Sequence, residues 1–174
     1  MPYLGLGPDT VVSTGGLSNV DQWRLSSAQS GNTSETYITS GLERVDDASW
    51  DGIGTGMSES SGVFSFPTTG IWDVEFIGSM LIGSGTSSRF IVLGIDVTTN
   101  NSSYNDRAVA MNSISGLSST TYQSGVCRTL VDVTDISNVK VKFWHQWATA
   151  TNGELVNNTD YNRTTFTFKR LGDT

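Results

Sequence analysis

The clearest pattern of apolar and polar positions lies in residues 62–82. Phe64 and Phe66 share one face of an extended chain before a break. After the break, five apolar residues share a face: Trp72, Val74, Phe76, Met80 and Ile82. Side chains alternate between the two faces of a β-strand, so this period of two predicts two strands that each bury one face. Pro67 has no N–H for a ladder and Gly70 can adopt a positive φ, so the residues between them predict a turn and the whole segment predicts a β-hairpin.

Short apolar runs separated by Gly, Ser, Asn and Asp continue to the end of the chain, and no amphipathic helix pattern interrupts them. Further strands are predicted at residues 90–97, 107–114, 122–133, 139–148 and 163–171. Such a succession is typical of an all-β sandwich or barrel. Residues 1–20 differ, because they hold Pro2 and Pro8, two of the three prolines, and show no sustained period. We therefore expect an extended N-terminal arm at 1–20 and one β domain at 21–174.

The net negative charge of the chain argues against some classes of binding partner. Ten basic and 17 acidic residues give a formal net charge of -7 and a pI near 4.4. Such a surface repels a phosphate backbone or an anionic membrane, so neither nucleic acid nor membrane is an expected partner. The first basic residue is Arg24, and the early apolar residues are interrupted by Gly, Pro and Asp. No signal peptide or spanning helix is therefore expected, and the chain is predicted to be made in the cytoplasm of its host cell.

Few residues are suited to catalysis. His145 is the only histidine, and it shares a strand face with Val141, Phe143 and Trp147, which predicts a core or interface histidine. Cys127 is the only cysteine, so no intrachain disulfide can form and a buried thiol is expected. The sequence predicts no enzyme and no cofactor.

Acidic residues leave two alternatives open. Carboxylates recur along the chain at Asp46, Asp47, Asp51, Asp132, Asp135 and Asp160. A pair of carboxylates could serve glycoside hydrolysis, but no spacing fixes a pair at catalytic separation. The pairs at 46–47 and 132–135 offer oxygen ligands to calcium, although no EF-hand spacing surrounds them. No metal site is predicted, and whether calcium binds stays open.

Several segments resemble one family of trimeric heads. They are Phe66-Pro67 with Gly70-Ile71-Trp72, the closing run Thr165-Phe166-Thr167-Phe168, and the opening Met1-Pro2-Tyr3-Leu4-Gly5. The chain resembles the globular heads of the first complement component and the tumour-necrosis-factor superfamily, in the form encoded by marine bacteriophages. This resemblance implies a two-sheet jelly roll that assembles as a homotrimer. It places Phe76, Tyr122, Phe166 and Phe168 at the trimer contact, with the alternative that these aromatics fill the monomer core.

The same resemblance implies a role in the virion. It predicts a non-enzymatic capsid decoration protein or short head fibre, located in the virion and in contact with other virion proteins, the major capsid protein in particular. The arm would be the attachment segment, through Pro2, Tyr3, Leu4 and Gly5. The alternative is a tail-fibre knob that binds a bacterial surface glycan through exposed Trp, Tyr and Asn side chains. The choice between capsid and tail, and the identity of the host, stay open at this stage.

Overall fold

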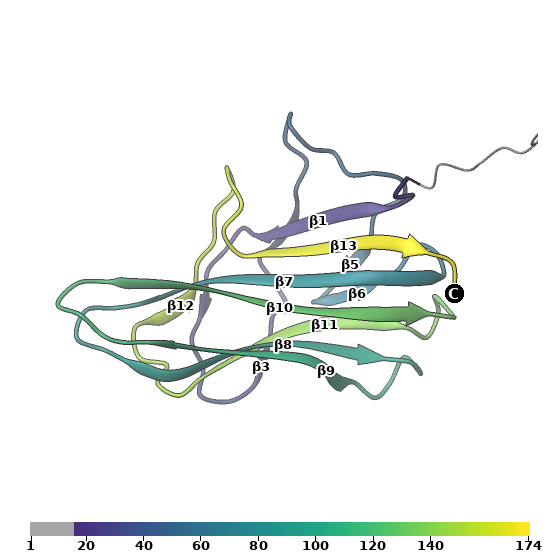
Figure 1. Cartoon of the computed structure of the whole chain (residues 1–174). Coiled ribbons are helices and arrows are strands. Elements are labelled where there is room, and N and C mark those ends of the chain that lie inside the picture. The colour runs from purple at the N-terminus through teal and green to yellow at the C-terminus, as the bar shows by residue number, and fades with distance from the viewer. Residues whose placement is uncertain (1–15) are drawn as a thin grey trace, which may run out of the picture.

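The computed structural model describes residues 16–174, which fold into two layers of antiparallel β-sheet (Figure 1). These residues form no helix, so none of them belongs to a helix that could cross a membrane. In chain order the strands are β1 (Val20–Leu25), β2 (Gln29–Ser30), β3 (Thr36–Tyr37), β4 (Leu42–Arg44), β5 (Ser58–Ser60), β6 (Val63–Ser65), β7 (Gly70–Ile82), β8 (Ser88–Thr98), β9 (Asn105–Ile114), β10 (Thr121–Val133), β11 (Lys140–Trp147), β12 (Gly153–Leu155) and β13 (Thr165–Gly172).

Each of the two sheets is named here after one of its long strands. In the first, called here the β7 sheet, the order is β2-β12-β7-β13-β1-β4, and β10 pairs with β7 along residues 70–82. In the second, the β8 sheet, the order is β5-β6-β11-β8-β9, and β3 pairs with β11. From β6 onward the chain changes sheet between β6 and β7, β7 and β8, β9 and β10, β10 and β11, and β11 and β12. This alternation makes the domain a jelly-roll sandwich, and it confirms the predicted all-β fold class.

The predicted hairpin at residues 62–82 is wrong, although both of its strands exist. β6 pairs with β5 and β11 in the β8 sheet, whereas β7 lies in the β7 sheet. The turn at Pro67 therefore carries the chain across the sandwich instead of folding it back within one sheet. Phe66 and Trp72, on either side of this turn, meet in the core with ring centroids 5.2 Å apart. A hairpin within one sheet and a crossing between two facing sheets give the same sequence pattern. In both arrangements every second side chain of each strand points into the core.

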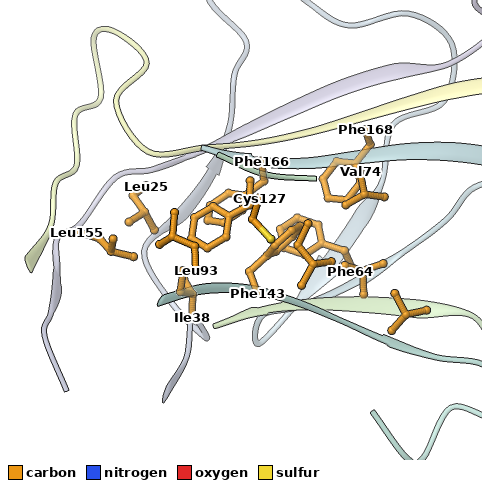
Figure 2. Packing of buried hydrophobic residues seen from close by; sticks show 14 of the residues in the cluster. Leu25, Ile38, Phe64, Val74, Leu93, Cys127, Phe143, Leu155, Phe166 and Phe168 are labelled. Atoms are coloured by element: carbon orange, nitrogen blue, oxygen red, sulfur yellow. The ribbon is translucent and has the colours of Figure 1, made fainter. Parts of the chain in front are cut away.

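The core between the sheets is rich in phenylalanine (Figure 2). The rings of Phe143 and Phe166 lie 4.6 Å apart between centroids, and those of Phe64 and Phe168 lie 5.1 Å apart. Cys127 is buried in the same cluster, as predicted, and has no disulfide partner. Tight packing of large apolar side chains therefore holds the two sheets together.

The described part of the chain begins within the predicted arm. Val20, the last residue assigned to the arm, is the first residue of β1, and its N–H donates to the Ile53 carbonyl at 2.9 Å. The Asn19 side chain donates to the Thr55 carbonyl at 2.8 Å. The rest of the predicted arm, including Pro2, Tyr3, Leu4 and Gly5, lies outside the described residues.

Candidate assembly surface

Two long strands form an edge of the sandwich. Among residues 16–174, β10 pairs only with β7, and β9 pairs only with β8. The two strands lie in contact with each other but share no ladder in the described structure. Edge strands of 10 and 13 residues present a row of backbone groups to a partner, and proteins normally cover or protect such edges.

The outward face of β10 carries exposed apolar side chains. Tyr122, Val126 and Leu130 are 59%, 54% and 62% exposed, and all three point away from the core. Opposite them on β7, Leu81 pairs with Tyr122 and Ile77 pairs with Val126. Together they form an apolar surface on the outside of the β7 sheet. Ser124 and Arg128 separate these three side chains along β10, so the row of apolar groups is interrupted by polar ones. Large apolar side chains exposed together on one face are a usual mark of a protein interaction site.

β9 adds apolar groups on the other side of the same edge. Met111 is 75% exposed and Val109 is 44% exposed, and they pair with Val92 and Gly94 on the β8 sheet. The β9–β10 edge therefore presents large apolar side chains on both outer faces of the sandwich.

An ion pair fixes β10 in the middle of its apolar row. Arg128 donates from Nε and Nη2 to the two carboxylate oxygens of Asp73, at 2.5 and 2.7 Å. Asp73 is only 1% exposed, although it lies on the outer face of β7. The hydrogen bond to Asp73 and its charge raise the pKa of the Arg128 guanidinium. Because two hydrogen bonds hold the Arg128 guanidinium, it keeps one orientation on this surface.

The seam between β9 and β10 is tight at one end and open at the other. Asn112 on β9 lies over Gly125 on β10, where an added Cβ would come within 2.3 Å of Asn112 Nδ2. That Nδ2 is buried and has no hydrogen-bond partner in the described structure. At the other end, Arg107 and Leu130 help to line a cleft of about 610 Å³ between the sheets. The seam is therefore an incompletely closed border of the sandwich.

The structure separates the four aromatic residues predicted at the trimer contact. Phe76, Phe166 and Phe168 are fully buried between the sheets of one chain. Figure 2 shows Phe166 and Phe168 within this core. Their burial favours the alternative that these three aromatics fill the monomer core. Even-numbered residues face inward on β7 and β13 but outward on β10, which leaves Tyr122 exposed. The alternation in the sequence shows which residues share a face of a strand, but not which of the two faces points into the core.

His145 occupies the core, as its strand face predicts. Its Nδ1 accepts a hydrogen bond from Trp147 Nε1 at 3.1 Å. Burial lowers the pKa of the imidazole to about 4, so the ring is neutral at physiological pH. A buried and neutral ring with Nδ1 already occupied is poorly placed to act as a general base.

The carboxylates considered for calcium serve local turns. Asp135 accepts hydrogen bonds from the Ser137 N–H and hydroxyl at 2.8 and 2.6 Å, and these bonds lower the pKa of its carboxyl group. Asp47 accepts from Ser49 in the same way. Among residues 16–174, no group of three or more His, Cys, Asp or Glu side chains is arranged to hold a metal ion.

A buried polar network on the outside of the β8 sheet escaped the sequence analysis. Trp144 Nε1 donates to the carboxylates of Asp96, at 2.8 Å, and Asp106, at 3.2 Å, and Asp96 also accepts from the Tyr37 hydroxyl at 2.6 Å. Burial, followed by the neighbouring Asp96, raises the pKa of Asp106. The Trp144 ring lies across Gly94, which has no side chain to obstruct it. Only the pairing of β8, β9 and β11 brings these residues together, so no local motif could have shown the network.

No protein-family model matches the chain, and no curated protein matches its sequence. Among solved structures, the fold is similar to that of PRD1 vertex protein P5, with a TM-score of 0.53 and 15% sequence identity. The match covers 91% of this chain and 100% of that one. At this level of identity the likeness concerns the fold alone. It supports the two-sheet jelly roll described above, which this chain shares with a vertex protein.

Proposed function

We propose that the chain is a non-enzymatic virion structural protein, a capsid decoration protein or short head fibre whose N-terminal arm anchors a jelly-roll head. The observation that carries this proposal is the fold likeness to PRD1 vertex protein P5, which spans all of that chain and nearly all of this one. The resemblance of the sequence to phage-encoded heads points in the same direction.

The head is proposed to act as a homotrimer that uses the β9–β10 edge. The exposed row of Tyr122, Val126 and Leu130 supports this, because a lone domain gains nothing by exposing large apolar groups along an unpaired edge. Three copies arranged around an axis would cover each edge with the neighbouring copy. Tyr122 remains the proposed contact from the original set of four aromatic residues.

The structure also offers little support for catalysis. The only histidine is buried and neutral, and the only cysteine is buried with its thiol pKa raised to about 11. A thiol with a pKa that high is almost entirely protonated at neutral pH and is a poor nucleophile. These environments support a structural role over a hydrolytic one.

The arm is the proposed attachment segment, and its deletion tests the function. Virus particles assembled with the full chain should contain many copies of it. Particles assembled with the truncated chain, residues 16–174, should contain none of the truncated chain. Tyr3→Ala should lower incorporation of the chain into particles more than Tyr161→Ala, which changes an exposed loop of the head. The reason is that an aromatic side chain that fills a pocket of its partner typically contributes most of the binding energy of a short segment. Quantitative mass spectrometry of purified particles gives the copy number. Full incorporation of the truncated chain would overturn the anchoring role of the arm.

Copy number also separates the two virion locations. Hundreds of copies per particle would support a capsid role, and a handful would point to a tail tip. Absence of the full chain from purified particles would overturn the virion role itself.

A further inference from the structure

A polar groove lies on the outer face of the β8 sheet, where β5 and β6 meet β11. Its volume is about 470 Å³. Apart from Val63, the side chains that line it are polar or aromatic: three serines, Glu59, Asn101, Tyr104 and Lys140. Most of the lining lies on β5, β6 and β11, in the opposite sheet from the β10 surface, whereas Asn101 and Tyr104 come from the loop that leads from β8 into β9.

The loop that forms one wall of the groove is held in place by its own hydrogen bonds. Asn100 Oδ1 accepts from the N–H groups of Ser102 and Ser103 at 3.0 and 2.9 Å. The Asn101 N–H donates to the Asn138 carbonyl at 3.0 Å, which ties the loop to the turn before β11. Asn101 and Tyr104 are thus presented on a preformed wall, so a ligand would lose little binding energy in ordering them.

Lys140 gives the groove a free positive charge. Its Nζ lies 3.0 Å from the Ser65 hydroxyl, and no carboxylate of residues 16–174 lies within 4.0 Å of it. The one carboxylate in the lining, that of Glu59, accepts from the Gly62 N–H at 2.6 Å in the β5–β6 turn. Lys142, two residues along the same face, has its Nζ 4.0 Å from the centroid of the Tyr104 ring. Lys140 and Lys142 therefore place two positive charges without ion pairs among the described residues on one face of a chain of net charge -7.

We propose that this groove binds an acidic saccharide. Serine hydroxyls and the Asn101 amide can donate to and accept from sugar hydroxyls. The Tyr104 hydroxyl can add a hydrogen bond to a sugar hydroxyl, and the Lys140 ammonium offers a charge-assisted hydrogen bond to a sugar carboxylate. This inference goes beyond the virion role and does not depend on it, because the site is complete within one chain.

Isothermal titration of the full chain tests the site with two probes of equal length. The acidic probe is a tetrauronate prepared from alginate, and the neutral probe is maltotetraose. The wild-type chain should bind the tetrauronate with a Kd of about 0.1–1 mM and maltotetraose at least about 10-fold more weakly. Lys140→Gln should weaken tetrauronate binding by at least about 10-fold and leave maltotetraose unchanged. Tyr104→Ala should weaken both.

A matched charge variant controls for unspecific attraction. Arg89→Gln removes one positive charge at the far end of β8 and should leave both affinities unchanged. Thermal unfolding of each variant shows that the fold is retained. Equal loss of tetrauronate binding in Lys140→Gln and Arg89→Gln would show that binding depends only on the overall charge of the chain, and it would overturn the proposed site. The absence of saturable binding by the wild-type chain up to about 10 mM would overturn it as well.

Discussion

His145 makes the stability of the fold depend on pH. Burial lowers the pKa of its imidazole from the ordinary 6.5 to about 4 in the folded chain. Between these two values the unfolded chain binds the proton more strongly than the folded chain. The contribution of the neutral imidazole to the free energy of unfolding is therefore fully present above pH 6.5. It falls by about 3 kcal/mol as the pH drops towards 4.

Urea unfolding at about pH 7.5, 5.5 and 4.5 measures this loss. His145→Gln keeps an oxygen acceptor for the Trp147 indole N–H but does not titrate, so its stability should change much less in the same window. Equal pH dependence of the two proteins would show that other groups cause the loss.

Phe168 tests whether the buried aromatic residues stabilise the core of a single chain. Because its ring is fully buried against Phe64, Phe168→Ala should leave a cavity and lower the free energy of unfolding by about 3–5 kcal/mol. Leu171→Ala, at an exposed position of the same strand, should change it by less than about 0.5 kcal/mol. Denaturant unfolding of both variants gives the comparison. A Phe168→Ala loss as small as that of Leu171→Ala would contradict the core assignment.

At the scale of elements, the sequence predicts the long strands but not their partners. The strand predicted at 90–97 is β8, and the one predicted at 163–171 is β13, with ends that differ by a few residues. Alternation depends only on which face is buried, so it locates such strands well. Pairing depends on contacts between distant segments, which is why the 62–82 segment predicted a hairpin. Strands of two or three residues, such as β2 and β12, are too short to show a period.

Gly94 tests the packing of β11 on β8. A Cβ at this position would lie 2.0 Å from the Trp144 ring, so Gly94→Ala must displace the indole and disturb its hydrogen bonds to Asp96 and Asp106. We expect a loss of about 1–3 kcal/mol in the free energy of unfolding. Gly172→Ala, which meets no atom within 4 Å, should cost little. Equal melting temperatures of the two variants would contradict the close approach of Trp144.

At the scale of the whole molecule, the core and the candidate assembly surface use different rows of the same strands. The inward row of β10 holds Cys127 and Val131, and the outward row holds Val126 and Leu130. Both rows contain apolar residues, so the sequence alone could not assign one to the core and the other to a partner. The fold supplies that assignment through the register of β10 on β7.

A surface variant separates assembly from folding. Val126→Glu places a charge on the outward row of β10 without touching the core, so it should yield a folded monomer. Ile136→Glu, at an exposed position between β10 and β11, should leave assembly unchanged. Sedimentation velocity with circular dichroism distinguishes a folded monomer from an unfolded chain. Unchanged assembly in Val126→Glu would remove the outward row of β10 from the interface.

The mass of the full chain in solution tests the trimeric head most directly. Multi-angle light scattering at micromolar concentration should give three times the chain mass of 18.7 kDa, because the β9–β10 edge would be covered by neighbouring copies. A mass of 18.7 kDa under the same conditions would contradict the trimer and leave the exposed apolar edge for a different partner.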